Sequence, residues 1–391
     1  MQKILLFIAS LFYFNFLFSK NEIKSWQGIH ETPLSRLEQQ FAEPPVEFAN
    51  HVIWGWEGKM DKKTICNDLD SIKKKGFRAV IFEAGYKLPF KYLSEEWFKA
   101  IRTGVVEAKK RDMKVWIIDE GKYPSGFAGG KFSQERPDLR MQALVIGDTI
   151  QIKRGEVMTN HKIAPEIISA VAVSTSGAPN RTVEINNGKI SFNAGLDDWK
   201  ILLVKSDFRT AVTRAVNNPN GGKDATNSLC DYLNPVAVQQ FIDWTHKQYK
   251  KYLGKELGTT VLGFRGDEPD YAHLPWTPSI VQTFKDTKGY DPTPYLASFF
   301  TASPTIQEQR VKADYWDVWS SLFATHFFKL QADWCAANGV AHITHLNKEH
   351  EMPACVKAEG DYFRALSKVQ IPGVDAIWNQ IWPSTLNDFP K

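Results

Sequence analysis

Two kinds of segment alternate along the first third of the chain. Short apolar runs are each followed by a charged segment whose apolar residues recur at helical spacing. The runs are HVIWGW (51–56), RAVIFEA (78–84) and KVWII (114–118). After the first run, Ile65, Leu69 and Ile72 follow the helical period, and after the second Ser94 is placed to cap a helix. Strand and helix therefore alternate at short intervals, which predicts a parallel α/β architecture.

The alternation stops near residue 140. Residues 141–216 carry alternating or β-branched runs separated by Gly, Asn and Asp, and Asn187 with Gly188 forms a two-residue hairpin signal. We expect a small antiparallel β insertion here. The α/β alternation resumes at 217–391, where residues 311–338 predict a long helix that ends at Gly339.

These segments predict an α/β fold of the (β/α)8 TIM-barrel type. We expect residues 21–140 and 217–391 to form two parts of a catalytic barrel, with the β-rich insertion of 141–216 between them. Only six strand-plus-helix units can be counted, whereas such a barrel has eight. The sequence therefore predicts a barrel that is incomplete at its C-terminal side.

The first residues have the pattern of an export signal. Lys3 precedes an apolar run from Ile4 to Phe18, which is shorter than the about 20 residues that a membrane span needs. We expect residues 1–20 to be a signal peptide and the mature protein to be secreted or periplasmic, with no membrane contact after cleavage. An uncleaved anchor is the alternative.

Charge and composition narrow the function classes. The 391 residues include 48 Lys and Arg against 44 Asp and Glu, a formal net charge of +4, which does not predict a nucleic-acid partner. The four cysteines are scattered without a C-x-x-C pair, which excludes a zinc knuckle and a disulfide scaffold. The 13 Trp, 12 Tyr and 25 Phe fit either a large aromatic core or a pocket that stacks on sugar rings. Composition does not choose between the two.

Carboxylates, amides and aromatic residues follow the predicted strands. In a parallel barrel these positions meet at one face, and glycoside hydrolysis needs one carboxyl as acid, a second as base or nucleophile, and polar and aromatic groups around the sugar. We predict as catalytic residues Glu268, Glu120 and Glu349. We predict as substrate-binding residues Trp54, Trp56, Glu83, Asp119, Tyr123, Arg265, Asp267, His345, Asn347, Asp375 and Trp378.

Each of these motifs also has a structural interpretation. In VLGFRGDEPD, Glu268 acts as general acid or base, or else is a structural carboxylate bonded to Arg265 or to loop amides. In WIIDEGKYPSGFAGG, Asp119 and Glu120 either bind a ligand or hold a tight glycine-rich turn.

The segment HITHLNKEHE is dense in metal-binding residue types, since His and carboxylate suit zinc or manganese. His342 and His345 are three apart in a predicted strand and should point to opposite faces. We therefore predict no metal site from this pair. Nucleophile-elbow, phosphate-loop, H-E-x-x-H and Rossmann glycine motifs are all absent from the sequence.

Several of these segments together resemble glycoside hydrolase family 106, the α-L-rhamnosidase-like enzymes. The similarity begins with the PP dipeptide and Trp-rich strand of FAEPPVEFANHVIWGWEGKMDKK and continues through EWFKAIRTGVVEAKKRDMKVWIIDEGKYPSG, DYLNPVAVQQFI, GDYFRAL and IPGVDAIWNQ. It covers residues 41–140 and 225–385.

The resemblance implies an exported enzyme that acts on side chains of plant or microbial polysaccharides, with Glu268 and a second carboxylate in hydrolysis. It implies no obligatory cofactor, although some enzymes with such barrels bind calcium. Family members are commonly longer, and the missing strands leave a second hypothesis open, a non-catalytic carbohydrate-binding protein or an inactive remnant. A third hypothesis is a metal-dependent hydrolase built on the His-rich segment.

Overall fold

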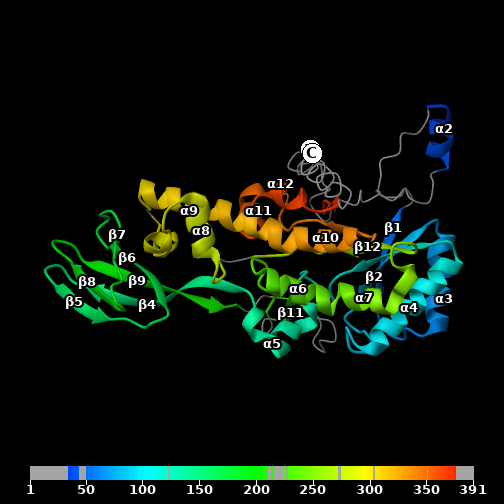
Figure 1. Ribbon diagram of the computed structural model, residues 1–391, viewed down its shortest axis with the longest axis horizontal. Coiled ribbons are helices and arrows are strands. Elements are labelled where there is room, and N and C mark those ends of the chain that lie inside the picture. The colour runs from blue at the N-terminus through cyan, green and yellow to red at the C-terminus, as the bar shows by residue number, and fades with distance from the viewer. Residues whose placement is uncertain are drawn as a thin grey trace, which may run out of the picture.

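The computed structural model describes residues 34–43, 50–121, 123–209, 213–214, 223–224, 228–271, 274–302, 304–349 and 351–375. The molecule is elongated (Figure 1), with a parallel sheet and its helices at one end and an antiparallel sheet at the other. The expected signal peptide, residues 1–20, lies outside the described residues. In the described part of the chain no helix is long and apolar enough to cross a membrane.

A six-stranded parallel sheet organises one end of the molecule. Its strands, in spatial order, are β1 (His51–Trp56), β2 (Ala79–Ala84), β3 (Lys114–Ile118), β12 (Val261–Arg265), β14 (Ala341–Thr344) and β15 (Ile371–Pro372). Every neighbouring pair is parallel. The predicted α/β fold is thus confirmed, but the described residues form six strands of an open sheet and do not close a complete (β/α)8 barrel.

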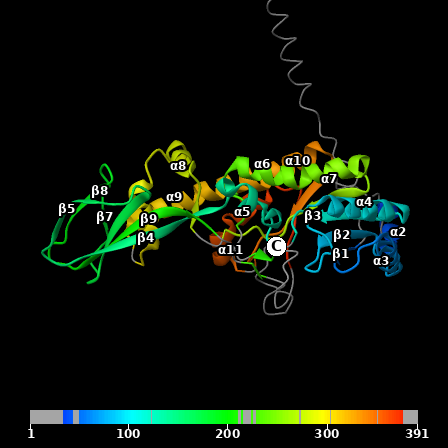
Figure 2. The same cartoon turned by 90° about the horizontal axis from the view of Figure 1, so that it is seen from below.

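Four helices pack with this sheet, and the first three begin at a side chain that caps them. They are α3 (Lys62–Lys74), α4 (Glu95–Lys110), α6 (Pro235–Trp244) and α7 (His246–Leu253). The carboxylate of Asp61 accepts a hydrogen bond of 2.9 Å from the backbone amide of Thr64. The hydroxyl of Ser94 accepts one of 3.3 Å from the backbone amide of Trp97, which confirms Ser94 as the predicted cap. Helices α6 and α7 follow one another along one side of the molecule (Figure 2).

The sheet has apolar side chains on both faces. Toward the helices, Trp56 packs against both Phe82 and Trp97 of α4, and none of these three is more than 1% exposed. Toward the inside, Trp116 and Leu262 form a separate small cluster with Ala341. Parallel strands buried on both faces read as continuous apolar runs, which is the pattern of the sequence.

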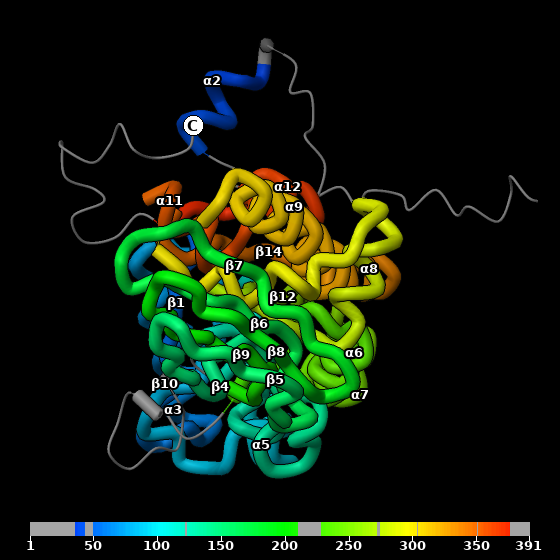
Figure 3. The backbone as a smooth tube through the Cα atoms, turned by 90° about the vertical axis from the view of Figure 1, so that its left-hand side faces the viewer, coloured from blue at the N-terminus to red at the C-terminus, as the bar shows by residue number. Residues whose placement is uncertain are grey.

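The β insertion is an antiparallel sheet at the far end of the molecule, in front in Figure 3. Its strands, in order, are β4 (Gln142–Ile152), β9 (Trp199–Phe208), β6 (Ile167–Ser174) and β7 (Arg181–Thr182), and β5 (Val157–Lys162) pairs separately with β8 (Lys189–Asn193). Strand β13 (Pro275–Trp276), from the later part of the chain, joins the sheet at its edge beside β4. Asn186 and Lys189 exchange two backbone hydrogen bonds around Asn187 and Gly188, both of positive φ. The predicted two-residue hairpin turn is confirmed.

Further helices join the two ends. They are α8 (Ile280–Lys288), η5 (Thr293–Phe300), α9 (Ile306–Leu322), η6 (Phe323–Phe328), α10 (Lys329–Ala337), α11 (Met352–Glu359) and α12 (Tyr362–Leu366). Two other helices, α2 (Leu34–Ala42) and α5 (Lys131–Glu135), lie earlier in the chain. The short strands β10 (Thr213–Arg214) and β11 (Lys223–Asp224) pair with each other. Helices α9, η6 and α10 run on without a break, as the predicted long helix requires. The amide of Ala297 in η5 donates to the hydroxyl of Ser169 in β6 at 3.0 Å, which joins this helical layer to the insertion.

Candidate active site

Most of the predicted site residues come together where β3, β12, β14 and β15 end. Parallel strands present their carboxyl ends at one edge, so residues far apart in sequence become neighbours there. Asp119 follows β3, Asp267 and Glu268 follow β12, His345 follows β14 and Asp375 follows β15. This edge of the sheet is the candidate site.

Ser125 joins the first two of these loops. Its hydroxyl donates to Oδ1 of Asp119 at 2.7 Å and accepts the backbone amide of Asp267 at 2.6 Å. Asp119 is fully buried, its Oδ2 has no hydrogen-bond partner among the described residues, and burial raises the pKa of its carboxyl to about 7. Asp119 is therefore linked to Asp267 through Ser125, and its buried side chain has no exposed surface that a ligand could contact.

Glu120 organises the glycine-rich loop. Its carboxylate accepts the backbone amides of Gly121 at 2.6 Å and Gly129 at 3.1 Å, and that of Ala128 as well. The side chain is fully buried, and burial raises its pKa to about 8 against the opposing effect of these donors. Because the loop amides occupy both oxygens, the geometry favours the structural alternative for Glu120, holding a tight turn.

His345 stands among three carboxylates. Its Nε2 lies 3.5 Å from Oδ1 of Asp267, 3.7 Å from Oε1 of Glu268 and 3.9 Å from Oδ2 of Asp375. On the other side of the ring, Nδ1 is 3.4 Å from Nη2 of Arg265. The imidazole is buried, whereas the three carboxylate side chains keep 20–22% of their surface exposed. These carboxylates can reach a ligand, and His345 lies between them.

Glu268 is the most unusual residue of this group. Its backbone has a φ of 39°, in the left-handed region that costs a non-glycine residue energy. Strain of this kind persists only where the surroundings enforce it, and it is concentrated at functional sites. The partly exposed Glu268 carboxylate is thus placed at the strand end by the fold, against the local preference of its backbone.

A second group adjoins the first. The side-chain amide of Asn347 donates to the hydroxyl of Tyr123 at 2.9 Å and to Oδ2 of Asp270 at 3.4 Å. The pKa of Tyr123 is raised, first by burial and then by the carboxylates around it. Two predicted binding residues, Tyr123 and Asn347, are therefore in direct contact across the site.

Glu359 belongs to this second group and was not predicted. It ends α11, is buried, and accepts the backbone amide of Asn347 on Oε1 at 3.0 Å, while Oε2 has no partner among the described residues. Burial, with the carboxylates of Asp270, Glu268 and Glu349 nearby, raises its pKa well above the usual range. In the sequence, Glu359 is a single glutamate next to Gly360, at the end of a helix. No sequence pattern around it indicates a site residue.

Glu349 is also buried, at 1% exposure. Its Oε1 accepts the backbone amide of Asp375, its Oε2 has no partner among the described residues, and burial raises its pKa. Through its hydrogen bond with the amide of Asp375, Glu349 positions this residue in the segment that follows β15.

The aromatic residues of β1 belong to the core that the sheet forms with its helices. Trp56 has no exposed surface and packs on Phe82 and Trp97, and the half-buried Trp54 packs on the same cluster. The core alternative therefore holds for Trp56, which offers no ring face to a sugar. Glu83, in β2, is half-buried beside Gly55, and Trp378 lies outside the described residues.

One set of side chains could hold a metal ion. Glu268, His345 and Asp375 each offer one ligand atom, and the three atoms lie within 4.8 Å of one another. One imidazole with two carboxylates suits zinc or manganese better than calcium, which prefers oxygen ligands. His342 is buried on the opposite side of β14, near the buried His246. It is therefore not part of this set, in agreement with the predicted opposite orientation of His342 and His345.

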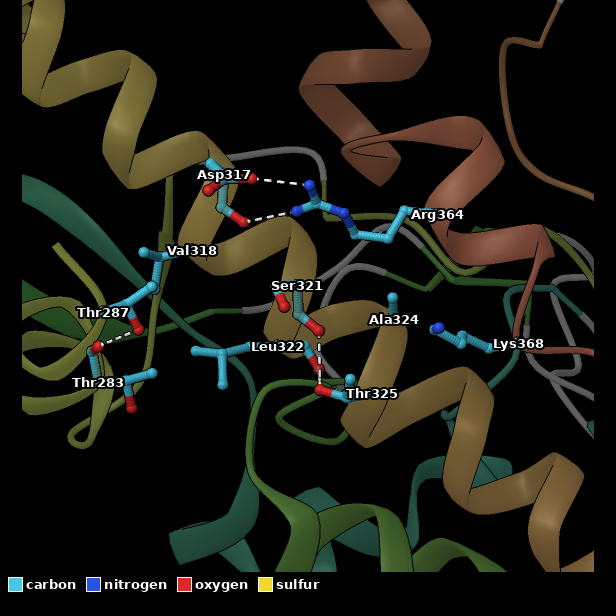
Figure 4. Close-up of a pocket in the computed structure, with 10 residues that line it drawn as sticks. All are labelled: Thr283, Thr287, Asp317, Val318, Ser321, Leu322, Ala324, Thr325, Arg364 and Lys368. Carbon is cyan, nitrogen blue, oxygen red and sulfur yellow. Dashed lines mark hydrogen bonds and ion pairs between the residues drawn. The ribbon is translucent and has the colours of Figure 1, made fainter.

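A separate pocket of about 370 Å³ lies among helices α8, α9 and α12 (Figure 4). Arg364 crosses it to bind the side chain of Asp317 at 2.7 Å. It shares no residue with the strand-end group, so we regard the strand ends as the candidate site.

Comparisons with known proteins identify the family of this chain. The family model of glycoside hydrolase family 106, described as alpha-L-rhamnosidase, matches residues 156–386. A putative beta-glucuronidase of Formosa agariphila is 23% identical over 360 residues, which cover 78% of this chain and 30% of that protein. The structure of a rhamnosidase from Novosphingobium sp. PP1Y superposes with a TM-score of 0.62 at 15% identity, covering 87% of this chain and 49% of that one.

The structural likeness shows a shared fold, and this chain spans less than half the length of either relative. The family match covers more than half of the chain and confirms the resemblance read from the sequence. The chain belongs to glycoside hydrolase family 106, the alpha-L-rhamnosidase family.

Proposed function

We propose that this protein hydrolyses glycosidic bonds in side chains of plant or microbial polysaccharides, with α-L-rhamnosides as its substrates and carboxylates as its catalytic groups. The family match supports the reaction class. The observation that carries the proposal is the position of Glu268, partly exposed at the end of β12 and 3.7 Å from His345.

We assign Glu268 the role of general acid. Its proton passes to the glycosidic oxygen as the bond to the anomeric carbon breaks. A water molecule then adds its hydroxyl to the anomeric carbon, and the remaining proton of that water passes to the Glu268 carboxylate, which restores the acid. Asp267 and Asp375 flank His345 with partly exposed side chains and are suited to hold sugar hydroxyls. Glu120 and Glu349, whose oxygens accept backbone amides, act in this scheme as positioning residues.

The distance between Glu268 and Asp375 limits their joint role. Their nearest oxygens are within 4.8 Å, whereas an inverting pair stands about 6.5–9.5 Å apart to admit a water molecule. We therefore do not assign water activation to Asp375.

The test is the Glu268→Gln variant of the full chain. We expect kcat/KM on a rhamnosyl disaccharide to fall about 10²–10⁴-fold, because general acid catalysis contributes this much. The loss should be smaller on nitrophenyl α-L-rhamnoside, whose leaving group needs little protonation. Glu135→Gln, at an exposed glutamate paired with Lys131, is the matched control. Equal activity of Glu268→Gln and wild type on both substrates would refute the assignment.

We also propose that the protein acts outside the cytoplasm. The support is the apolar run of residues 4–18 after Lys3, together with a polysaccharide substrate. N-terminal sequencing of protein recovered from the culture medium or periplasm tests this, and a chain that keeps Met1 and remains with the cells would argue against it.

A second candidate is a carbohydrate-binding protein without turnover. The burial of Glu120 and Glu349, two of the three predicted catalytic carboxylates, favours it. Sugar binding by the purified chain with no release of rhamnose at long incubation would support this candidate, and measurable turnover would exclude it.

A further inference from the structure

We propose that the groove behind α11 binds an anionic saccharide, a uronate-bearing stretch of the same polysaccharide whose neutral sugar enters the strand-end site. This inference rests on the proposed function, since it names the chemical class of the substrate beyond the cleaved sugar. It concerns a surface formed by η5, α9 and α11, outside the carboxylate group.

The size of the groove favours an extended ligand. Its volume is about 1730 Å³, against roughly 300–1,000 Å³ for small-molecule sites. One wall is formed by η5 and α9 and the other by α11. Figure 1 shows α9 and α11 as neighbours on the upper side of the molecule.

The lining combines aromatic faces with positive charge. Phe299 and Trp316 stand with ring centroids 6.3 Å apart, and both are only partly buried. Flat apolar rings of this kind match the faces of sugar rings. Among the described lining residues, the charged ones are Lys312, Lys348, Lys357 and Glu351, so positive charge is in excess. The Nζ of Lys312 lies over the Trp316 ring, 5.6 Å from its centre, so a cation adjoins the aromatic part of the lining.

The groove begins where the candidate site ends. Lys348 lies between Asn347 and Glu349, which both belong to the site, and Ala358 of the groove adjoins Glu359 of the site. Consecutive Cα atoms are about 3.8 Å apart, so the two surfaces share α11 and the loop before it as a common wall. In the proposal, one polysaccharide chain passes over this wall and contacts both surfaces.

The two surfaces differ in charge. In the described part of the site, even with Glu268 protonated as the acid, the carboxylates of Asp267 and Asp375 outnumber the one guanidinium, that of Arg265, and this disfavours an anionic sugar by like-charge repulsion. The groove carries three lysines and one glutamate. This division selects a neutral sugar for the site and a carboxylate-bearing sugar for the groove.

The test uses the intact 391-residue chain and two probes of the same backbone, tetragalacturonate and its methyl ester, in titration calorimetry. We expect tetragalacturonate to bind at least about fivefold more tightly than the neutral ester, and this preference to shrink at high salt. In Lys312→Gln/Lys357→Gln the affinity for tetragalacturonate should fall about 3- to 10-fold with little change for the ester. Trp316→Ala should weaken both probes.

The matched control is Lys247→Gln/Lys329→Gln, which removes two positive charges from exposed lysines of α7 and α10. Equal binding of acid and ester, equal losses in both double variants, or no binding at all would overturn the proposal. Cleavage of aryl α-L-rhamnosides reports on the proposed function separately. Cleavage of the rhamnosides without tetragalacturonate binding would refute only the groove proposal. Tetragalacturonate binding without cleavage would refute only the proposed function.

Discussion

The hydroxyl of Ser125 accepts a hydrogen bond of 2.6 Å from the backbone amide of Asp267, and the amide of Ser125 donates in return to the carbonyl of Asp267 at 2.9 Å. The two residues belong to loops that follow different strands. Since the same hydroxyl donates to Asp119, one buried side chain fixes the start of the segment that carries Glu268.

We expect Ser125→Ala to weaken both stability and catalysis. The change leaves Oδ1 of Asp119 and the amide of Asp267 without their partner in the interior, a cost of about 1–3 kcal/mol in the free energy of unfolding. Because Asp267 precedes Glu268, kcat should fall more than KM rises. Urea denaturation and steady-state kinetics measure the two effects. Ser176→Ala, at an exposed hydroxyl of the insertion, should change neither, and a fully active, equally stable Ser125→Ala would show that the bridge is dispensable.

Asp231 predicts a pH dependence of stability. Its carboxylate accepts the hydroxyl of Thr277 at 2.7 Å and the amide of Leu233 at 3.0 Å, and burial raises its pKa from 3.8 to about 7. The folded state thus keeps the proton up to about pH 7, while the unfolded state releases it near pH 4. Between these values raising the pH favours unfolding, by up to about 1.4 kcal/mol per pH unit from this group.

Asn at this position cannot ionise, so Asp231→Asn should become more stable relative to wild type as the pH rises from 5 to 7. The difference between the two proteins isolates Asp231 from Asp119 and Glu120, whose raised pKa values act in the same direction, and from His342, whose lowered pKa acts in the opposite one. Urea denaturation at unit steps of pH measures it. Parallel curves for the two proteins would mean that Asp231 is ionised in the folded state.

Trp56 tests whether the first strand contributes a sugar contact. The indole is fully buried against Phe82 and Trp97. Trp56→Phe should therefore lower the free energy of unfolding, by less than the about 3–5 kcal/mol lost when such a ring is removed altogether, and leave KM unchanged. Thermal denaturation and kinetics on an aryl rhamnoside separate the two. A raised KM with unchanged stability would restore the ligand-binding interpretation.

The order of strands and helices could be read from the sequence because local signals agree with the fold. Ser94 caps its predicted helix, and Asn187 with Gly188 makes the predicted turn. The gathering of Asp267, His345 and Asp375 was also predictable, since the carboxyl ends of parallel strands share one edge.

The direction and burial of individual side chains were not predictable in the same way. Both faces of the sheet are apolar, so the pattern around Trp56 does not indicate which face it joins. Glu120 is buried because the glycine-rich loop turns its amides onto the carboxylate, helped by positive φ at Ala128 and Gly129. Glu359 reaches the site only through the packing of α11, a non-local contact that the pattern of one helix does not contain.

The metal-binding potential of Glu268, His345 and Asp375 gives the last prediction. A carboxylate bound to a divalent ion cannot carry the proton that the general acid must deliver. If Glu268 is the acid, the purified active chain should contain no stoichiometric zinc or manganese by plasma mass spectrometry, and adding either ion should inhibit hydrolysis. His345→Gln should reduce that inhibition, because it removes the nitrogen ligand for which these ions compete. Stoichiometric zinc or manganese in the active protein would instead support the metal-dependent hydrolase and make Glu268 a ligand.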